Sequence, residues 1–593
     1  MPPSGLVGQF FRQFGMTVAV ATLFSLFVSF TLTPMLASRW LRTADAEEQK
    51  GVLGAIARRW EAGYARLLRA YRRALEWSLV HRWVVVVVAV VSFLGAVALV
   101  PLDIIGSEFV PTQDQGEFNL MVEMPPGTSL AATNEAVLAL EPKVRNLPEV
   151  KNCFTSVGIS GSGFFVTSES RYARLSIQLV ERGHRSRSVQ EVAREIESLA
   201  ATIPDMKTHV QYPAIGEDPR QPFLVYLLGE DQEALRKLGR EVTEIVKSIP
   251  GTRDVTNSAG VSSPEIRVEA DQNRLADLGL TSAQVGLTVR TYLQGAVASH
   301  LRPEGQSKVD IRVIASEADR ESVDRLESLP VLTSRGAVVS LGSIADVRTV
   351  ESPIEISRWN RQRCVTVGAN VVGRPLGDVV DEFNARAGGL RLPAGYSLRL
   401  SGQTQLMEES FDTLVTALAL SIVLIYMLLV SLYESLLYPF IIMLALPVSL
   451  CGVFGALWLT GRTLNISSLI GIIMLMGLVA KNGILLVDYT NTLRKKGIAR
   501  DDALLEAGPV RLRPILMTTL AMVAAMMPVV LVMGEGAEIR APLATAVAGG
   551  LITSTVLTLV VVPVVYTLLD DVQTRLGWGW RQERPSDAAP KGV

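Results

Sequence analysis

A lysine stands inside one of the most apolar stretches of the chain. Residues 465–489 read NISSLIGIIMLMGLVAKNGILLVDY, and Lys481 lies well inside this run, followed by Asn482. A charge near the centre of a bilayer costs about 2.5–3.5 kcal/mol, so it is usually paired within a helix bundle or lines a hydrated path. In the competing interpretation Lys481 snorkels to the membrane surface, since Asp488 is roughly 10 Å of helix rise away. The position favours an internal ionic role.

A buried ammonium group requires a counter-charge, and the apolar runs offer none that is well placed. Asp488 is near the end of its run, and Glu434 falls in a turn. The following run carries Thr518, which forms hydrogen bonds but holds no charge, and Arg511 flanks its start. We therefore expect the acidic partner of Lys481 to come from another segment.

The chain contains seven apolar runs of about 20 residues, and Lys481 lies in the fifth. Each run is long enough for a helix to cross the roughly 30 Å hydrocarbon core. They lie at 14–36, 83–101, 412–433, 437–459, 466–488, 514–534 and 546–568. The sequence therefore predicts an α-helical membrane bundle of seven transmembrane helices. Residues 53–77 form an amphipathic pattern typical of a helix along a membrane surface. The net charge of −1 gives no reason to expect a nucleic-acid partner.

Basic residues indicate the orientation of these runs. They follow the first run and separate the fifth from the sixth, and such segments tend to stay in the cytoplasm. Alternating crossings then place residues 102–411 in the periplasm and also place the start of the chain outside. The opening residues resemble no signal peptide, so we expect a further segment upstream of Met1.

The large external region alternates strand and helix patterns, which predicts an α+β architecture of small split βαβ modules. Period-two alternation predicts strands at 118–124, 172–180, 264–270, 308–315 and 396–402. Amphipathic patterns predict helices at 131–147, 188–203, 231–249 and 318–326.

One external loop combines small residues with two aromatic side chains. Residues 158–168 read GISGSGFFVTS and include Phe164 and Phe165. The two rings either pack locally at a hairpin tip or belong to a mobile flap that lines an apolar ligand pocket. No catalytic grouping, phosphate loop or metal-ligand spacing is found, so we expect neither an enzyme nor a cofactor.

Four segments carry extended motifs: GLVAKNGILLVDYTN (477–491), RLRPILMTTLAM (511–522), FFRQFGMTVAVA with TLTPML (10–36) and VPTQDQGEF (110–118). These motifs resemble those of RND (resistance–nodulation–division) multidrug efflux transporters of the hydrophobe/amphiphile efflux class. The resemblance divides the chain into a transmembrane helix (1–40, the sixth of the family), a cytoplasmic amphipathic linker (41–82), a second transmembrane helix (83–101), a periplasmic porter subdomain (102–212), the first part of a second porter subdomain (213–261), a docking subdomain (262–350), the second part of that porter subdomain (351–411), a five-helix transmembrane bundle (412–568) and a cytoplasmic tail (569–593).

The resemblance implies that the chain is the C-terminal half of an inner-membrane proton/drug antiporter driven by the proton-motive force. It assigns the proton relay to Lys481, Arg511 and Thr518, and contacts with amphiphilic small molecules to Phe154, Phe164 and Phe165. It implies an N-terminal half that carries an acidic relay pair. It also implies a homotrimer in membrane lipid, a periplasmic adaptor protein and an outer-membrane channel, which together form a tripartite envelope pump.

Two alternatives stay open. A heavy-metal RND exporter is one, although that subclass usually has an acidic residue where Lys481 and Asn482 stand, and the external segment holds no cluster of methionines. A truncated, non-transporting fragment of such a pump is the other, because Met1 begins just before an apolar run.

Overall fold

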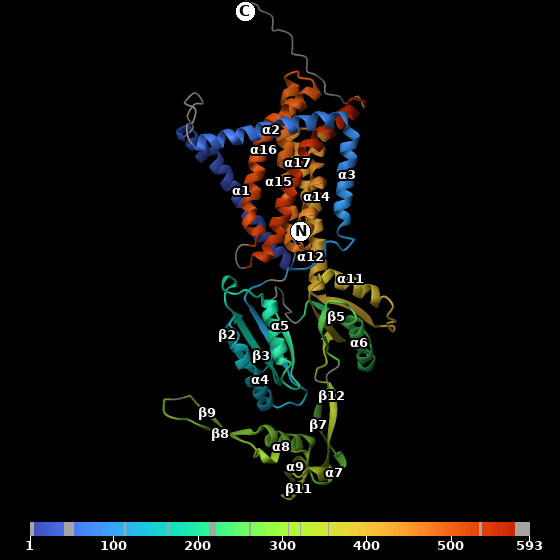
Figure 1. Cartoon of the computed structure of the whole chain (residues 1–593). Helices are drawn as coiled ribbons and strands as arrows, with labels where there is room; N and C mark the ends of the chain where they lie inside the picture. The colour runs from blue at the N-terminus through green and yellow to red at the C-terminus, as the bar shows by residue number, and fades with distance from the viewer. Residues whose placement is uncertain are drawn as a thin grey trace, which may run out of the picture.

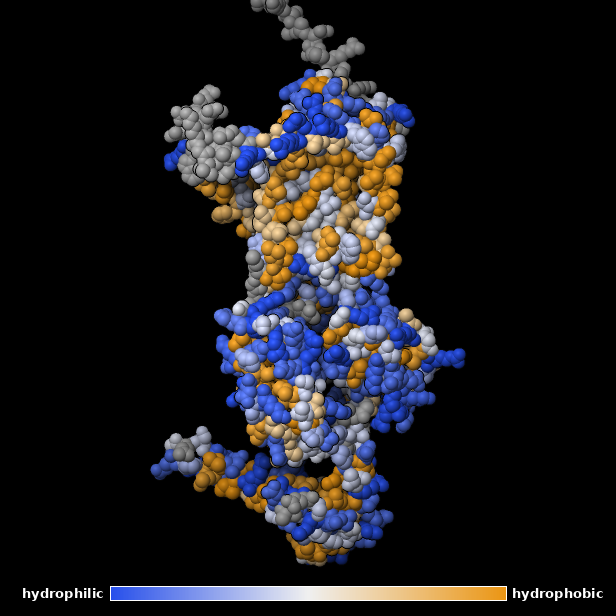
Figure 2. All heavy atoms as spheres, in the orientation of Figure 1, coloured by the Kyte–Doolittle hydropathy of each residue, from blue (hydrophilic) through white to orange (hydrophobic). Residues whose placement is uncertain are grey.

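The computed structural model describes residues 5–40, 52–111, 114–162, 165–212, 221–259, 262–305, 307–320, 322–353, 355–532 and 536–575. Along one long axis these residues form a helical block, then two α/β units side by side, then a smaller unit at the far end (Figure 1). Hydrophobic residues cover the helical block between two hydrophilic ends (Figure 2). The helical block is therefore an apolar layer, and polar surfaces lie on either side of it along the long axis.

Long apolar helices make up the helical block. They are α1 (Gly5–Trp40), α3 (Arg82–Ala98), α12 (Gln403–Tyr433), α13 (Leu437–Met443), α14 (Ala445–Leu459), α15 (Ile466–Lys495), α16 (Arg500–Val530) and α17 (Ala537–Arg575). Among the described residues six helical segments are long and apolar enough to cross a membrane, with α13 and α14 forming one of them, and a bent helix pair raises this to seven at most. Each of the seven apolar runs expected from the sequence overlaps these helices, although 83–101 and 514–534 extend past the ends of α3 and α16.

The bent pair consists of α2 (Val52–Val80) and α3, which meet at 101°. Helix α2 lies across one end of the helical block (Figure 1), and we call this the α2 end. The amphipathic helix expected at 53–77 is thus present as α2. At the opposite end the α/β units begin.

Helices α14 and α17 pack closely because glycines face each other across their contact. A Cβ on Gly452 would lie 2.3 Å from the carbonyl oxygen of Gly549, and one on Gly549 would lie 2.6 Å from the carbonyl oxygen of Gly452. Small residues of this kind let membrane helices approach through their backbones. Helix α17 is therefore packed directly against α14, and it also contacts α15 and α16.

The first α/β unit contains a four-stranded antiparallel sheet in the order β2-β3-β1-β4. Its strands are β1 (Glu117–Glu123), β2 (Val150–Ser162), β3 (Phe165–Leu179) and β4 (Lys207–Gln211). Helices α4 (Leu130–Arg145) and α5 (Val189–Ala200) cover one face, where alternate residues such as Leu120 and Val122 are buried. A capping box between Ser188 and Glu191 starts α5.

The second α/β unit is built around a sheet in the order β13-β14-β5-β15, with β6 also paired to β14. Its elements are β5 (Phe223–Gly229), α6 (Gln232–Lys247), β6 (Thr252–Asn257), β13 (Arg358–Trp359), β14 (Gln362–Val371), α11 (Leu376–Ala387) and β15 (Ser397–Gly402). Phe223 and Phe383 pack edge to face in its core, with ring centroids 5.2 Å apart. Strand β15 runs directly into α12, so this sheet is joined to the helical block without a loop.

The far unit is reached through the antiparallel pair β7 (Ser262–Ala270) and β12 (Ala345–Pro353). It holds α7 (Gln272–Asp277), α8 (Ser282–Gln294), the projecting hairpin β8 (Ala296–Leu301) and β9 (Val309–Val313), α9 (Val323–Glu327), β10 (Pro330–Leu332), β11 (Val338–Ser340) and α10 (Leu341–Ile344). The single helix expected at 318–326 is wrong. The Ser322 side chain accepts a hydrogen bond from the Arg325 amide, which starts α9 as a separate helix after a short 3₁₀ turn.

The other expected elements agree with the structure. The strands expected at 118–124, 172–180, 264–270, 308–315 and 396–402 correspond to β1, β3, β7, β9 and β15. The helices expected at 131–147, 188–203 and 231–249 correspond to α4, α5 and α6. An α+β region between apolar helices is therefore confirmed.

Candidate ion-relay site and ligand-contacting face

Helix α15 carries Lys481 about half-way along its 30 residues. Lys481 is exposed, whereas its neighbours Ala480 and Asn482 are buried. Gly477 and Asp488 are exposed on the same face, at spacings of about one and two helical turns from Lys481. Within the described residues no acidic side chain pairs with Lys481. The ammonium group therefore points out of the chain from the middle of an apolar helix.

A buried polar cluster joins three helices beside Lys481. Asn482 Nδ2 donates to Thr555 Oγ1 over 3.3 Å, and the hydroxyls of Thr519 and Thr555 are 2.9 Å apart. All three residues are at most 4% exposed. Asn482 Oδ1 is buried with no hydrogen-bond partner among the described residues. The sequence does not reveal this cluster, because its members become neighbours only when α15, α16 and α17 pack together.

The cluster also fixes the depth of Thr518. Because Asn482 and Thr519 both contact Thr555, the residues that precede them, Lys481 and Thr518, lie at the same depth of the block. Thr518 is half-buried and donates to the Ile515 carbonyl over 3.0 Å. The structure thus places two of the predicted relay residues on one level.

Arg511 lies nearer the α2 end. Its guanidinium is 4.6 Å from the ring centroid of Tyr489, and its Nε atom is buried without a hydrogen-bond partner in the described part of the chain. Tyr489 is eight positions, or about 12 Å of rise, beyond Lys481 along α15. Arg511 and Lys481 therefore lie at different depths of the block.

Phe154 lies on β2, on the face of the first sheet that α4 and α5 leave uncovered; we call this the open face. Its side chain is 69% exposed. Phe165 is the first residue of β3 and pairs with Ser162, so the expected hairpin is present. Phe164 and the side chain of Phe165 lie outside the described residues.

Polar side chains line the rest of the open face. Strand register aligns Met121 with Arg174 of β3 on one side and with His209 of β4 on the other. Ser156 of β2 is the other register partner of Arg174. Sequence reasoning missed these residues, because a polar residue at every second strand position is typical of any half-buried strand.

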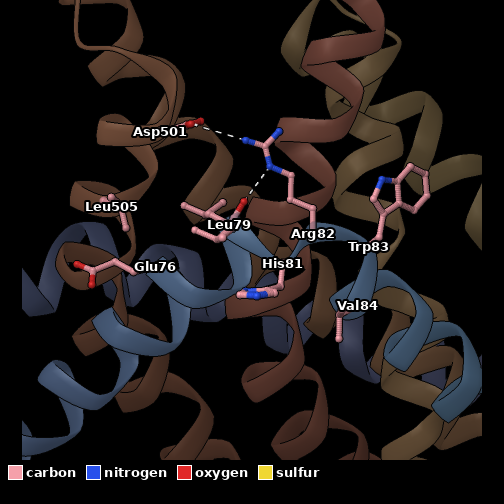
Figure 3. A pocket seen from close by; sticks show the side chains of 9 residues that line it. Glu76, Leu79, His81, Arg82, Trp83, Val84, Asp501 and Leu505 are labelled. Atoms are coloured by element: carbon pink, nitrogen blue, oxygen red, sulfur yellow. Dashed lines mark hydrogen bonds and ion pairs between the residues drawn. The ribbon is translucent and has the colours of Figure 1, made fainter.

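A cavity of about 770 Å³ opens at the corner between α2 and α3 (Figure 3). Its charged side chains are already paired: Arg82 with Asp571 at 2.8 Å and with Asp501 at 3.7 Å, and Glu76 with Arg72 at 3.2 Å. In Figure 3 the guanidinium of Arg82 reaches toward Asp501 while Trp83 stands on the other side. Arg82 thus joins α3 to α16 and α17, whereas Glu76 and Arg72 pair within α2.

The same end of the block is fastened by more ion pairs. Arg494 of α15 lies 2.8 Å from Asp570 of α17, and Arg500 of α16 lies 3.3 Å from Asp570. Together with Arg82 and Asp571, these pairs tie α3, α15, α16 and α17 to one another.

At the opposite end, residues 106–109 connect α15 to the second α/β unit, and we call them the link segment. The Leu464 amide donates to the Gly106 carbonyl over 2.9 Å, just before α15 begins. The Gly377 amide of α11 donates to the Ser107 carbonyl over 2.8 Å. Phe109 is 1% exposed and belongs to a cluster with residues of α12 and α15. The link segment thus contacts both α15 and the second α/β unit.

The link segment holds a titratable group. Burial raises the pKa of the Glu108 carboxyl, while hydrogen bonds from Thr463 and Asn465 oppose that rise. Thr463 donates to Glu108 Oε1 directly.

A second connection between the helical block and the α/β units is an ion pair. It joins Arg182 of the first α/β unit to Glu538 in the first turn of α17.

The chain is similar to known proteins in both sequence and structure. A model of the AcrB/AcrD/AcrF family matches residues 3–570. Two solved structures of a heavy metal efflux pump, crystal forms II and I, share 26% sequence identity with TM-scores of 0.77 and 0.76. Each match covers 86% of this chain and 53% or 52% of the solved chain. The chain thus spans about half the length of the solved structures that it matches.

Proposed function

Because the chain belongs to the AcrB/AcrD/AcrF family of RND efflux transporters, we propose that it forms the C-terminal half of a proton/drug antiporter. In this proposal the complete pump exports amphiphilic compounds and is driven by the proton-motive force. It stands in a bacterial inner membrane, with the α/β units and the far unit in the periplasm.

The outward position of Lys481 supports this proposal most directly. In lipid, an exposed ammonium at mid-span would cost about 2.5–3.5 kcal/mol or more. A protein surface that carries carboxylates would remove that cost, and RND family members are multi-pass membrane transporters. We propose that two carboxylates of a second, N-terminal half pack against the Lys481 face of α15.

Protonation then drives the cycle. Protons that neutralise the carboxylate pair weaken its attraction for Lys481, and the helices repack with Thr518 and Arg511 on the neighbouring helix. Movement of one charge across 100 mV supplies about 2.3 kcal/mol. That energy shifts a two-state population about fifty-fold.

The remaining assembly follows from the same family membership. We propose that the two α/β units act as porter subdomains and that the far unit docks to an outer-membrane channel. The pump works as a homotrimer with a periplasmic adaptor protein. Phe154, Phe164 and Phe165 contact the transported molecule, since aromatic faces accept ligands of many shapes.

The proposal is tested by Lys481→Ala in the complete pump, reconstituted in vesicles with an imposed pH gradient. Efflux of a fluorescent amphiphile should fall to the level of empty vesicles, because the relay loses the ammonium group of Lys481. Lys495→Ala, at the exposed end of the same helix, serves as the matched control and should leave efflux intact. Undiminished efflux by the Lys481 variant would reject the relay.

Heavy-metal export is a second candidate, because the two solved structures are of a heavy metal efflux pump. Within the described residues no group of three or more His, Cys, Asp or Glu side chains is placed to hold a metal ion. The two candidates differ in one measurement: efflux of Ag⁺, Cu⁺, Zn²⁺ or Cd²⁺ from the same vesicles. Metal efflux without amphiphile efflux would favour the second candidate.

A further inference from the structure

The open face of the first sheet satisfies most of its own polar groups. Ser176 Oγ donates to Asn119 Oδ1 over 2.7 Å, and Asn152 Nδ2 donates to Gln178 Oε1 over 2.8 Å. These bonds join neighbouring strands across the face. A polar group on the open face that has no hydrogen-bond partner is therefore an exception.

Arg174 is such a group. It lies on β3, an inner strand, between Met121 of β1 and Ser156 of β2. Its Nε and Nη2 atoms are buried and have no hydrogen-bond partner among the described residues. The residue as a whole is half-buried, and Nη1 is not among its buried unpaired atoms, so the guanidinium reaches the open face through Nη1. Buried polar groups are nearly always paired, and one left unpaired calls for an ion, a water or a ligand.

Glu123 and Glu169 do not pair with Arg174 in the described part of the chain. Glu123 lies on the same face, but its Oε1 accepts from Arg171 Nη1 over 2.5 Å. Glu169 accepts from Arg171 Nε over 2.6 Å. Arginine keeps its charge at any physiological pH. The centre of the open face thus carries one uncompensated positive charge.

The other basic side chains in this register, His209 and Lys207, lie on β4, an edge strand of the sheet. Burial lowers the pKa of His209, while Asp254 and Glu123 oppose that fall. On the described inner strands β1 and β3, the cation on the open face is therefore the guanidinium of Arg174.

An apolar surface lies within reach of that cation. Strand register pairs Phe154 with Ser176 and Ser156 with Arg174, which makes Phe154 a diagonal neighbour of Arg174. Diagonal neighbours on one sheet face are about 7–8 Å apart, within reach of long and aromatic side chains. One ring and one guanidinium at that spacing match a molecule with an aromatic body and an anionic group.

We infer that Arg174 is a specificity-determining residue that binds the carboxylate, sulfonate or sulfate group of an anionic amphiphile while Phe154 contacts its apolar body. This inference rests on the proposed function, because it names the class of substrate that the open face accepts. Guanidinium pairs with such groups through two parallel N–H···O bonds. Cationic and neutral amphiphiles gain nothing from Arg174.

Two fluorescent probes with the same aromatic skeleton test the inference: 8-anilino-1-naphthalenesulfonate, which is anionic, and N-phenyl-1-naphthylamine, which is neutral. Their affinities are measured with the full chain in lipid nanodiscs. Arg174→Gln should weaken binding of the sulfonate about tenfold or more, because a charge-assisted hydrogen bond is lost, and change binding of the neutral probe less than about twofold. Arg174→Lys, which keeps the charge, should retain part of the sulfonate affinity.

Arg194→Gln is the matched control, because Arg194 is exposed on α5, the layer behind the sheet. It should change neither affinity. Equal sulfonate affinity in wild type and Arg174→Gln, including no binding by either, would overturn the inference. Equal losses for both probes would show a purely structural Arg174 and would overturn it as well.

The experiment separates this inference from the proposed function, since no proton gradient is present. Lys481→Ala should leave the affinities of both probes unchanged even though it stops export. Selective sulfonate binding with a dispensable Lys481 would reject the relay alone, and an essential Lys481 with no charge selectivity would reject the role of Arg174 alone.

Discussion

At the scale of single residues, Thr555 is the hydroxyl that both Asn482 and Thr519 contact in the middle of the helical block. Thr555→Val keeps the shape and removes both hydrogen bonds. Such bonds within membrane proteins contribute about 0.6 kcal/mol on average and up to about 1.7 kcal/mol. We expect a loss of about 1 kcal/mol in the free energy of unfolding, measured by detergent-induced unfolding of the reconstituted chain.

Thr492→Val is the control for this measurement, because Thr492 is exposed on the same helix as Asn482 and bonds only to the Asp488 carbonyl within the described residues. A double-mutant cycle with Thr519→Val should show coupling between the two hydroxyls. Purely additive losses would contradict the cluster.

Glu108 gives a pH dependence whose sign follows from its surroundings. Burial raises the pKa of the folded carboxyl above its ordinary value of about 4.5. Its contribution to stability is therefore full below that value and is lost as pH rises through the raised pKa. Glu108→Gln should remove this decline, which is measured as the thermal unfolding midpoint between pH 4 and pH 8.

Glu135→Gln is the corresponding control, because Glu135 is exposed on α4 and its substitution should leave the pH profile unchanged. An identical pH profile for wild type and Glu108→Gln would contradict the burial argument.

The sequence alone pointed to some of the candidate site residues and not to others. Lys481 stands out in the sequence because a charge interrupts an apolar run. Arg174 does not, because its lack of a partner depends on strand register and on Arg171 holding both nearby carboxylates. The contacts of Phe164 stay a prediction, since this residue lies outside the described part of the chain.

At the scale of elements, the link segment depends on a close approach that only glycine allows. A Cβ on Gly377 would lie 2.0 Å from Ser107 Oγ and 2.9 Å from its carbonyl oxygen. Gly377→Ala should separate α11 from the link segment and destabilise the contact by about 1–3 kcal/mol. We expect export by the complete pump to fall while the helical block keeps its helix content, as measured by transport and circular dichroism.

Gly389 offers a matched control just after α11, because a Cβ there would meet only the Arg386 carbonyl oxygen at 3.7 Å. Gly389→Ala should leave export unchanged. Normal export by Gly377→Ala would show that the contact between the link segment and α11 is not needed for transport.

The periodic elements were predictable because local patterns decide them. Strands such as β1 and helices such as α6 follow directly from period-two and period-3.6 burial. A surface helix at 53–77 followed by a crossing run at 83–101 implied a turn between them, but the ion pairs of Arg82 with Asp501 and Asp571 beside that turn did not follow from the sequence. The helix expected at 318–326 failed because a single serine cap outweighed the amphipathic pattern.

At the scale of the whole molecule, the sequence predicted the family and the separation into a helical block and α/β units. It did not predict which segments contact one another between these layers. No local pattern shows that residues 106–109 lie between α11 and the start of α15. The subdomain boundaries and the homotrimer stay proposals, and the chain spans about half of each solved structure that it matches.

The two ends of the helical block are joined to their surroundings by different interactions. Ion pairs of Arg82, Arg494 and Arg500 join the helix ends beside α2 to one another, whereas backbone hydrogen bonds of the link segment join the other end to the second α/β unit. A helix of 30 residues such as α15 is about 45 Å long. A tilt of about 5° around one end would displace the other end by about 4 Å, so a small rearrangement beside Lys481 would be enlarged at the far end of α15.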